Sequence, residues 1–131
     1  MVATGEDLNL GTWVLGREFV EAYLAAVEST SAIYHDTGTV PPMAVAARAM
    51  GALIEVLKLP AGTIHASQEL ECKGVLRQSE EVRCVARVSR PRVRGDWSLM
   101  IVEFGVSRLG EGSIVAGKST VLVPVSEAAL E

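Results

Sequence analysis

The chain has 131 residues, of which 49% are hydrophobic and 21% charged, and its formal net charge at pH 7 is -4. This length suits one well-buried core and is too short for two ordinary domains, so we expect a single domain over residues 1–131. The acidic balance argues against nucleic acid as a partner, and the lack of a signal peptide or of about 18 consecutive apolar residues argues for a cytoplasmic protein with no membrane contact.

The first predicted element is an amphipathic helix over residues 17–28. Its apolar residues recur at the spacing of one helix face: Phe19, Val20, Tyr23, Leu24 and Val27. Residues 29–31, Ser-Thr-Ser, favour leaving the helix because their hydroxyls compete for backbone hydrogen bonds. A loop is therefore expected as far as residue 40.

A second helix is predicted from the Pro41-Pro42 pair to about residue 59. Proline can open a helix, since the N–H groups of the first turn have no partner within the helix. Residues 43–59, MAVAARAMGALIEVLKL, are apolar almost all round, which is typical of a helix buried on every side. We expect the sheet to contact its alanine-rich first half, so that Ala47→Leu overpacks the core.

After Gly62 the hydrophobic period changes to two, which predicts β-strands. In residues 63–72 a half-buried strand alternates apolar with polar residues, with His65 on the polar face and Gln68 as the polar residue on the apolar face. Three further strands are predicted near residues 80–89, 97–108 and 112–125, with turns at 95–96 and 110–112. Together these strands form an antiparallel meander.

One apolar helix followed by long antiparallel strands has a simple packing solution. The right-handed twist of a sheet lets it curl around the helix, which predicts an α+β hotdog fold with a long central helix wrapped by a curved antiparallel β-sheet. An exposed sheet edge is commonly covered by a second sheet, so at least a dimer is expected. Cys72 and Cys84 are expected to pack as small structural thiols, and with no CxxC or nearby histidine pair we expect neither metal nor cofactor.

Residues 25–50, AAVESTSAIYHDTGTVPPMAVAARAM, resemble the MaoC-like hotdog family of (R)-specific enoyl-thioester hydratases and 3-hydroxyacyl-thioester dehydratases, in particular its divergent, non-catalytic half-domains. In active members of the family the first helix leads into A-x-x-G-D-x-N-P-x-H, whose aspartate and histidine add or remove water. The same frame has Ser29 at the aspartate position and Tyr34 at the histidine position. Downstream, residues 64–84 are similar to the family's H-x-x-Q-x-F strand, with Ser79-Glu80 in place of its Gly-Asp turn.

The resemblance implies an acyl-CoA or acyl-ACP thioester as ligand, and a homodimer or a heterodimer with a catalytic hotdog subunit. Serine is neither acid nor base near pH 7, and tyrosine, with a usual pKa near 10, is a poor base. An accessory, non-catalytic subunit is therefore expected. The positions that the resemblance assigns to substrate binding are Pro42, Met43, His65 and Gln68, of which His65 is alternatively a structural histidine with satisfied hydrogen bonds.

Several residues leave alternatives open. His35 and Asp36 are either a displaced acid/base pair or solvated loop residues, and Glu28 is either a carboxylate base or a solvated end of the first helix. An independent hotdog thioesterase or hydratase that uses these groups is the alternative function. The arginines of SRPRVRGD either hold the phosphates of coenzyme A or keep a hairpin tip soluble: Arg90, Arg92 and Arg94.

Overall fold

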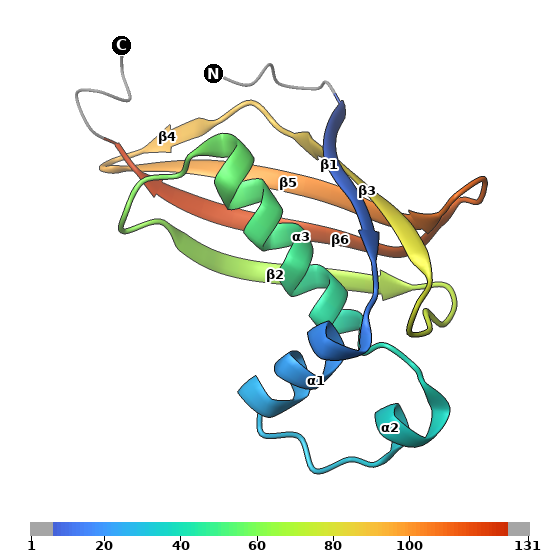
Figure 1. Ribbon diagram of the computed structural model, residues 1–131. Coiled ribbons are helices and arrows are strands. Elements are labelled where there is room, and N and C mark those ends of the chain that lie inside the picture. The colour runs from blue at the N-terminus through green and yellow to red at the C-terminus, as the bar shows by residue number, and fades with distance from the viewer. Residues whose placement is uncertain (1–6, 126–131) are drawn as a thin grey trace.

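The computed structural model describes residues 7–125, and within this range it contains three helices and six strands. Figure 1 shows helix α3 lying against one face of a twisted sheet, with α1 and α2 beyond the first turn of α3. None of the helices in this range is both long and apolar enough to span a membrane. In chain order the elements are β1 (Asp7–Val14), α1 (Arg17–Ala26), α2 (Ile33–Thr37), α3 (Pro42–Leu57), β2 (Ile64–Cys72), β3 (Glu81–Val88), β4 (Arg92–Arg94), β5 (Trp97–Arg108) and β6 (Ser113–Pro124).

All strand pairs of the sheet are antiparallel, and the strand order is β1-β3-β5-β6-β2, with β4 paired to the start of β5. The α+β fold with a central helix on a curved antiparallel sheet is thus confirmed. The predicted meander holds only for β3, β5 and β6. Strand β2 pairs with β6 at the far edge, because β1 occupies the edge of β3 that β2 would otherwise take.

Strand β1 has no counterpart among the predicted elements. Its apolar residues do not alternate regularly, because a bulge lies between Asn9 and Gly11. Gly11 has a φ of 118° and donates its N–H to Asn9 Oδ1 at 3.0 Å, a conformation that favours glycine. The bulge turns Leu10 and Trp13 onto the same side of the sheet, where both are 8% exposed.

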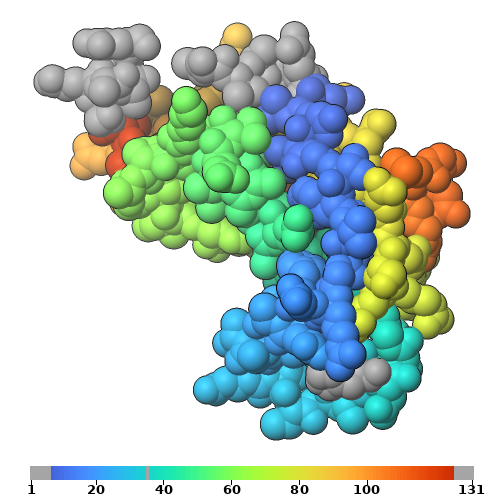
Figure 2. All heavy atoms as spheres, viewed as in Figure 1, coloured from blue at the N-terminus to red at the C-terminus, as the bar shows by residue number. Residues whose placement is uncertain are grey.

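Helix α3 is buried on one face only, which corrects the expectation of a helix surrounded by strands. Ala49 and Leu53 are each 1% exposed, whereas Met43 is 48% and Ile54 is 47% exposed. Ala47 also lies on the exposed face, so the predicted overpacking by Ala47→Leu is wrong for this chain. The reason is that the sheet covers one side of the helix, and Figure 2 shows atoms of α3 at the surface beside β1.

Helix α1 covers the end of the core at which α3 begins (Figure 1). Val20 and Leu24 are buried, as the helical spacing predicts. The guanidinium carbon of Arg48 on α3 lies 4.9 Å from the centroid of the Trp13 ring and 5.3 Å from that of Phe19. These distances are typical of cation–π contacts, so Arg48 ties α3 to both β1 and α1.

Strand β2 is the most exposed of the long strands. The expected half-buried alternation is absent, because every residue of β2 is exposed or only partly buried. Cys72, at its end, is exposed, which corrects the expectation that this thiol is packed. Cys84 on β3 is buried as expected, and burial raises the pKa of its thiol to about 12.

Candidate functional site

The segment that resembles the hydratase motif begins where α1 ends. The Ser29 N–H donates to the carbonyl of Leu24 at 2.9 Å, and the Glu28 N–H donates to that of Ala25 at 3.1 Å. This pair of bonds is the Schellman arrangement, in which the residue after the helix adopts a left-handed backbone. Glu28 is that residue, with a φ of 53°.

The left-handed residue supports the register of the resemblance. In the pattern A-x-x-G-D the glycine falls at Glu28, and glycine is the residue that adopts this conformation without cost. In that register Ser29 falls at the aspartate position of the pattern.

Ser29 is half-buried, and its hydroxyl takes part in a local turn. The Ser31 N–H donates to Ser29 Oγ at 3.4 Å, and the Ile33 N–H donates to Ser31 Oγ at 3.4 Å. Among the side chains that the structure describes, no carboxylate or imidazole hydrogen-bonds to the Ser29 hydroxyl. None of the described side chains therefore activates Ser29 as a nucleophile.

Tyr34 lies on α2, a helix of 5 residues in the segment that the sequence predicts to be a loop. The Asp36 N–H donates to the carbonyl of Ala32, and the Thr37 hydroxyl donates to the carbonyl of Ile33. These local hydrogen bonds stabilise the short helix despite its polar residues. The Tyr34 ring is half-buried against the core, and Asp36 is exposed. The side chain of His35 lies outside the described part of the structure.

The connection between α1 and α3 is anchored to residues 73–80. The Val40 N–H donates to the carbonyl of Leu76 at 2.8 Å, and the Gln78 N–H donates to that of Gly38 at 2.7 Å. Helix α3 then begins at Pro42, which is half-buried, followed by the exposed Met43. Because two backbone bonds cross between the segments, residues 38–40 have a fixed position relative to the sheet.

An ion pair stabilises the same region. Arg108 on β5 binds the Glu80 carboxylate and the carbonyl of Val75, while Glu80 Oε1 accepts the Arg77 N–H at 2.7 Å. The hydrogen bond from Arg108, supported by that of Arg77, holds the pKa of the Glu80 carboxyl below its usual value. Ser79 and Glu80, which the resemblance aligns with the family's Gly-Asp turn, lie in a hydrogen-bonded turn, and Ser79 has a φ of 72°.

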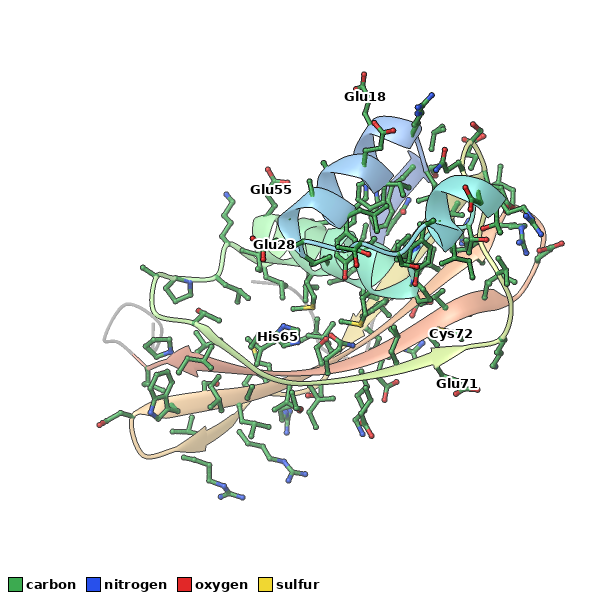
Figure 3. All side chains as sticks on the ribbon, turned by 90° about the horizontal axis from the view of Figure 1, so that it is seen from below. Glu18, Glu28, Glu55, His65, Glu71 and Cys72 are labelled. Atoms are coloured by element: carbon green, nitrogen blue, oxygen red, sulfur yellow. The ribbon has the colours of Figure 1, made fainter. Side chains whose placement is uncertain are left out.

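A cavity of about 260 Å³ lies at the other end of α3, where the chain turns into β2. His65 lines it, because a bulge between His65 and Ser67 pairs His65 with the buried Val121. Figure 3 shows His65 on the helix side of the sheet. The expectation that His65 lies on the polar outer face is therefore wrong. The other lining residues are Met50, Ile54, Leu59, Pro60, Ala61, Gly62, Thr63 and Val121.

Gln68 faces the helix as predicted, but its side chain is bound within the sheet. Its Nε2 donates to the carbonyl of Glu69 at 2.8 Å, and its Oε1 accepts the hydroxyl of the fully buried Ser119 at 2.6 Å. Ser119 Oγ also lies 3.2 Å from Met50 Sδ, which connects the sheet to α3. Sequence reasoning missed Ser119, although it is the serine among the inward-facing valines of β6.

The structure separates the predicted site residues into two groups. Ser29, Tyr34 and Asp36 lie on the connection between α1 and α3, and none of them lines the cavity beside His65. The three arginines lie exposed around β4, at the end of the sheet where α3 turns into β2: Arg90, Arg92 and Arg94. Figure 1 shows β4 at the opposite end of the molecule from α2.

No protein-family model matches this sequence, and no curated protein sequence does either. Among solved structures, the (R)-hydratase from A. caviae involved in PHA biosynthesis aligns with a TM-score of 0.74 and 21% identity, over 94% of this chain and 98% of that one. The MaoC-like dehydratase from Rhodospirillum rubrum aligns with a TM-score of 0.71 and 17% identity, over 95% and 94% of the two chains. The HadBC (3R-hydroxyacyl-ACP dehydratase) complex from Mycobacterium tuberculosis aligns with a TM-score of 0.76 and 11% identity, over 93% and 98%. The chain therefore has the hotdog fold of MaoC-like hydratases and dehydratases.

Proposed function

We propose that this chain is a MaoC-like protein that binds acyl thioesters and acts in the cytoplasm as a non-catalytic subunit of an enoyl-thioester hydratase or 3-hydroxyacyl-thioester dehydratase. The observation that carries the proposal is the left-handed backbone at Glu28, which supports Ser29 as the counterpart of the catalytic aspartate. Hydration needs a base for water and an acid for the α-carbon. Ser29 and Tyr34 supply neither.

The ligand would be an acyl group carried by coenzyme A or by an acyl carrier protein. The cavity beside His65 supports this assignment, since Met50, Ile54 and Val121 give it an apolar lining. Its volume of about 260 Å³ suits part of an acyl chain and not the carrier. The arginines around β4 lie near this end of the sheet and would pair with phosphates of the carrier.

The partner would be a catalytic subunit of the same fold. One of the similar structures is a complex of 3R-hydroxyacyl-ACP dehydratase chains, which supports a heterodimer as the assembly. The active acid/base pair would then come from the partner, while this chain contributes binding surface. A homodimer is the other assembly, and it would leave both copies without the pair.

The proposal is tested with the purified chain and crotonyl-CoA or longer enoyl-CoA substrates. We expect no hydration and no release of free thiol by the chain alone, and we expect it to copurify with the hydratase-like product of a neighbouring gene. The variant Ser29→Asp with Tyr34→His should fold, and detectable hydration of crotonyl-CoA by this variant would support the loss of an ancestral acid/base pair at these positions. Turnover by the wild-type chain, abolished by a substitution that leaves the fold intact, would show that the chain has its own site.

An independent enzyme is the second candidate, either a hydro-lyase or a thioesterase. It is favoured by the exposed carboxylates of Glu28 and Asp36 on the connection before α3, where either group would activate a water molecule. Glu28→Gly and Asp36→Asn each remove one of the two carboxylates, and His35→Ala removes the imidazole of the displaced acid/base pair. Retained activity in all three variants would rule this candidate out as formulated.

A further inference from the structure

A row of charged residues crosses the outer face of the sheet, which is the face opposite α3. Strand pairing places these residues directly opposite their neighbours, and all of them are exposed. The signs alternate from strand to strand without exception. From β1 to β2 the row consists of Asp7, Arg87, Glu103, Lys118 and Glu69.

Opposite charges on directly paired residues stabilise a particular strand order, and like charges oppose it. Arg87 Nη2 lies 2.9 Å from Asp7 Oδ1 at the β1 end of the row. Both side chains of this pair are more than half exposed, so the row adds little to stability. Its effect is on which strands pair with each other, because a mispaired strand would bring like charges together.

The row ends on a negative charge at an open edge. Within residues 7–125, β2 is the last strand of the sheet, and its outer backbone edge pairs with no strand in that range. Glu71 is a second carboxylate on the same face, opposite Ala116 on β6. Both glutamates are exposed, and β2 contains no lysine or arginine.

A second copy of this chain does not complement that edge. Antiparallel pairing of β2 with itself about Glu69 would place the two Glu69 carboxylates opposite each other. Pairing about Leu70 would place Glu69 opposite Glu71 twice, and pairing about Gln68 would oppose Glu69 with the neutral Ser67. Each of these registers leaves the carboxylates without a lysine or arginine partner, since β2 contains neither.

We propose that the β2 edge binds the edge strand of a different chain, which carries Lys or Arg on its outer face opposite Glu69 and Glu71. This inference rests on the proposed function, since the partner would be the catalytic subunit. The exposed Ile54 of α3 lines the same cavity as His65 of β2, so a partner on this edge would also cover apolar surface. The alternating row would then continue across the interface, and the charges would select the heterodimer over the homodimer.

The experiment needs only this chain and its variant Glu69→Lys with Glu71→Lys. The wild type and the isotopically labelled variant are mixed at micromolar concentration, and their assembly is followed by native mass spectrometry and light scattering. We expect the mixed dimer to have a dissociation constant at least about tenfold lower than a dimer of either chain alone. The preference should weaken at about 0.5 M salt, where exposed charges are screened.

The matched control is Glu18→Lys with Glu81→Lys, which changes the net charge equally at exposed positions on α1 and β3, away from β2. It should not form the mixed dimer. If the double variant does not fold, Glu71→Lys alone keeps the test, since Glu71 faces the neutral Ala116.

Two results would overturn the inference: a wild-type homodimer that the lysine variant does not weaken, or a mixture that assembles no better than the wild type alone. Turnover is not part of this test, so the two proposals fail separately. A wild-type chain that hydrates crotonyl-CoA but forms the mixed dimer would refute the proposed function and the catalytic subunit as partner, and would leave the pairing rule of the β2 edge standing. A chain that is inactive and forms no mixed dimer would refute only the pairing rule.

Discussion

The left-handed backbone of Glu28 has a cost, because a side chain with a Cβ crowds its own carbonyl in that conformation. Glu28→Gly would remove the crowding and should raise the free energy of unfolding by roughly 0.5–1 kcal/mol. Chemical denaturation measures this directly. Glu28→Ala is the control, because it removes the carboxylate but keeps the Cβ, and it should not stabilise the chain. Equal stabilities of the two variants would contradict the Schellman assignment.

The same substitution is informative about chemistry. A variant that is more stable than the wild type cannot lose activity by unfolding. Loss of turnover in Glu28→Gly would therefore identify the carboxylate as a working group of an independent enzyme.

The Glu80 ion pair makes stability depend on pH. The pKa of Glu80 is lowered in the folded chain, mainly by Arg108, so the group contributes stability above its unfolded pKa. This contribution is lost as pH falls through the lowered folded value. Glu80→Gln should thus destabilise the chain at pH 7, and the difference from the wild type should disappear in strong acid.

Thermal unfolding of the wild type and of Glu80→Gln, measured from pH 7 down to strong acid, tests this prediction. Glu111→Gln is the matched control, since Glu111 also contacts Arg108, at 3.3 Å, but its side chain is 54% exposed. Its effect at pH 7 should be smaller. A difference between wild type and Glu80→Gln that persists unchanged at low pH would contradict the assignment of the pKa shift to folding.

At the scale of elements, helix α3 offers a paired test of which face is buried. Ala49→Leu should overpack the contact with the sheet and cost roughly 1–3 kcal/mol of unfolding free energy. Ala47→Leu, on the exposed face, should change the stability of the isolated chain little. Denaturant midpoints of the two variants measure the contrast, and equal losses would mean that the helix is covered on both sides.

The sequence predicts elements whose periodicity is undisturbed and fails where a bulge interrupts it. The helix starting at Pro42 and the β5–β6 hairpin have long regular patterns, and both are confirmed. Strand β1 is not predicted because the bulge before Gly11 breaks the alternation of its apolar residues. The face of His65 is mispredicted for the same reason, since the bulge at residues 65–67 shifts the alternation by one residue.

Contacts distant in sequence were also beyond prediction. The placement of β2 next to β6 depends on β1 occupying the edge of β3, and no local pattern encodes that competition. The cavity residue Val121 lies 56 positions after His65 in the chain, and only the strand pairing brings the two together. By contrast, the end of the first helix is predicted to within two residues, at residue 28 against Ala26, because a helix end is determined locally.

At the scale of the whole molecule the two sheet edges differ. Strand β1 has two buried residues, Leu10 and Trp13, whereas β2 has none. Backbone amides in an exposed edge strand open locally at low cost. Hydrogen exchange should therefore be faster along β2 than along the central β5 and β6, and a bound partner should slow it selectively at β2. Protection of β2 in a chain shown to be monomeric would contradict this.

The bulge in β2 has a consequence for chain length. In a regular strand, removing one residue turns every side chain on one side of the deletion to the opposite face. Here Ala66 is the additional residue, because His65 pairs with Val121 and Ser67 pairs with Thr120, its direct neighbour. A chain without Ala66 would form a regular strand in which His65 still faces the cavity. Related sequences that differ by this single residue would thus keep the same cavity lining, and an alignment that closes the gap elsewhere in β2 would reverse the faces of the strand.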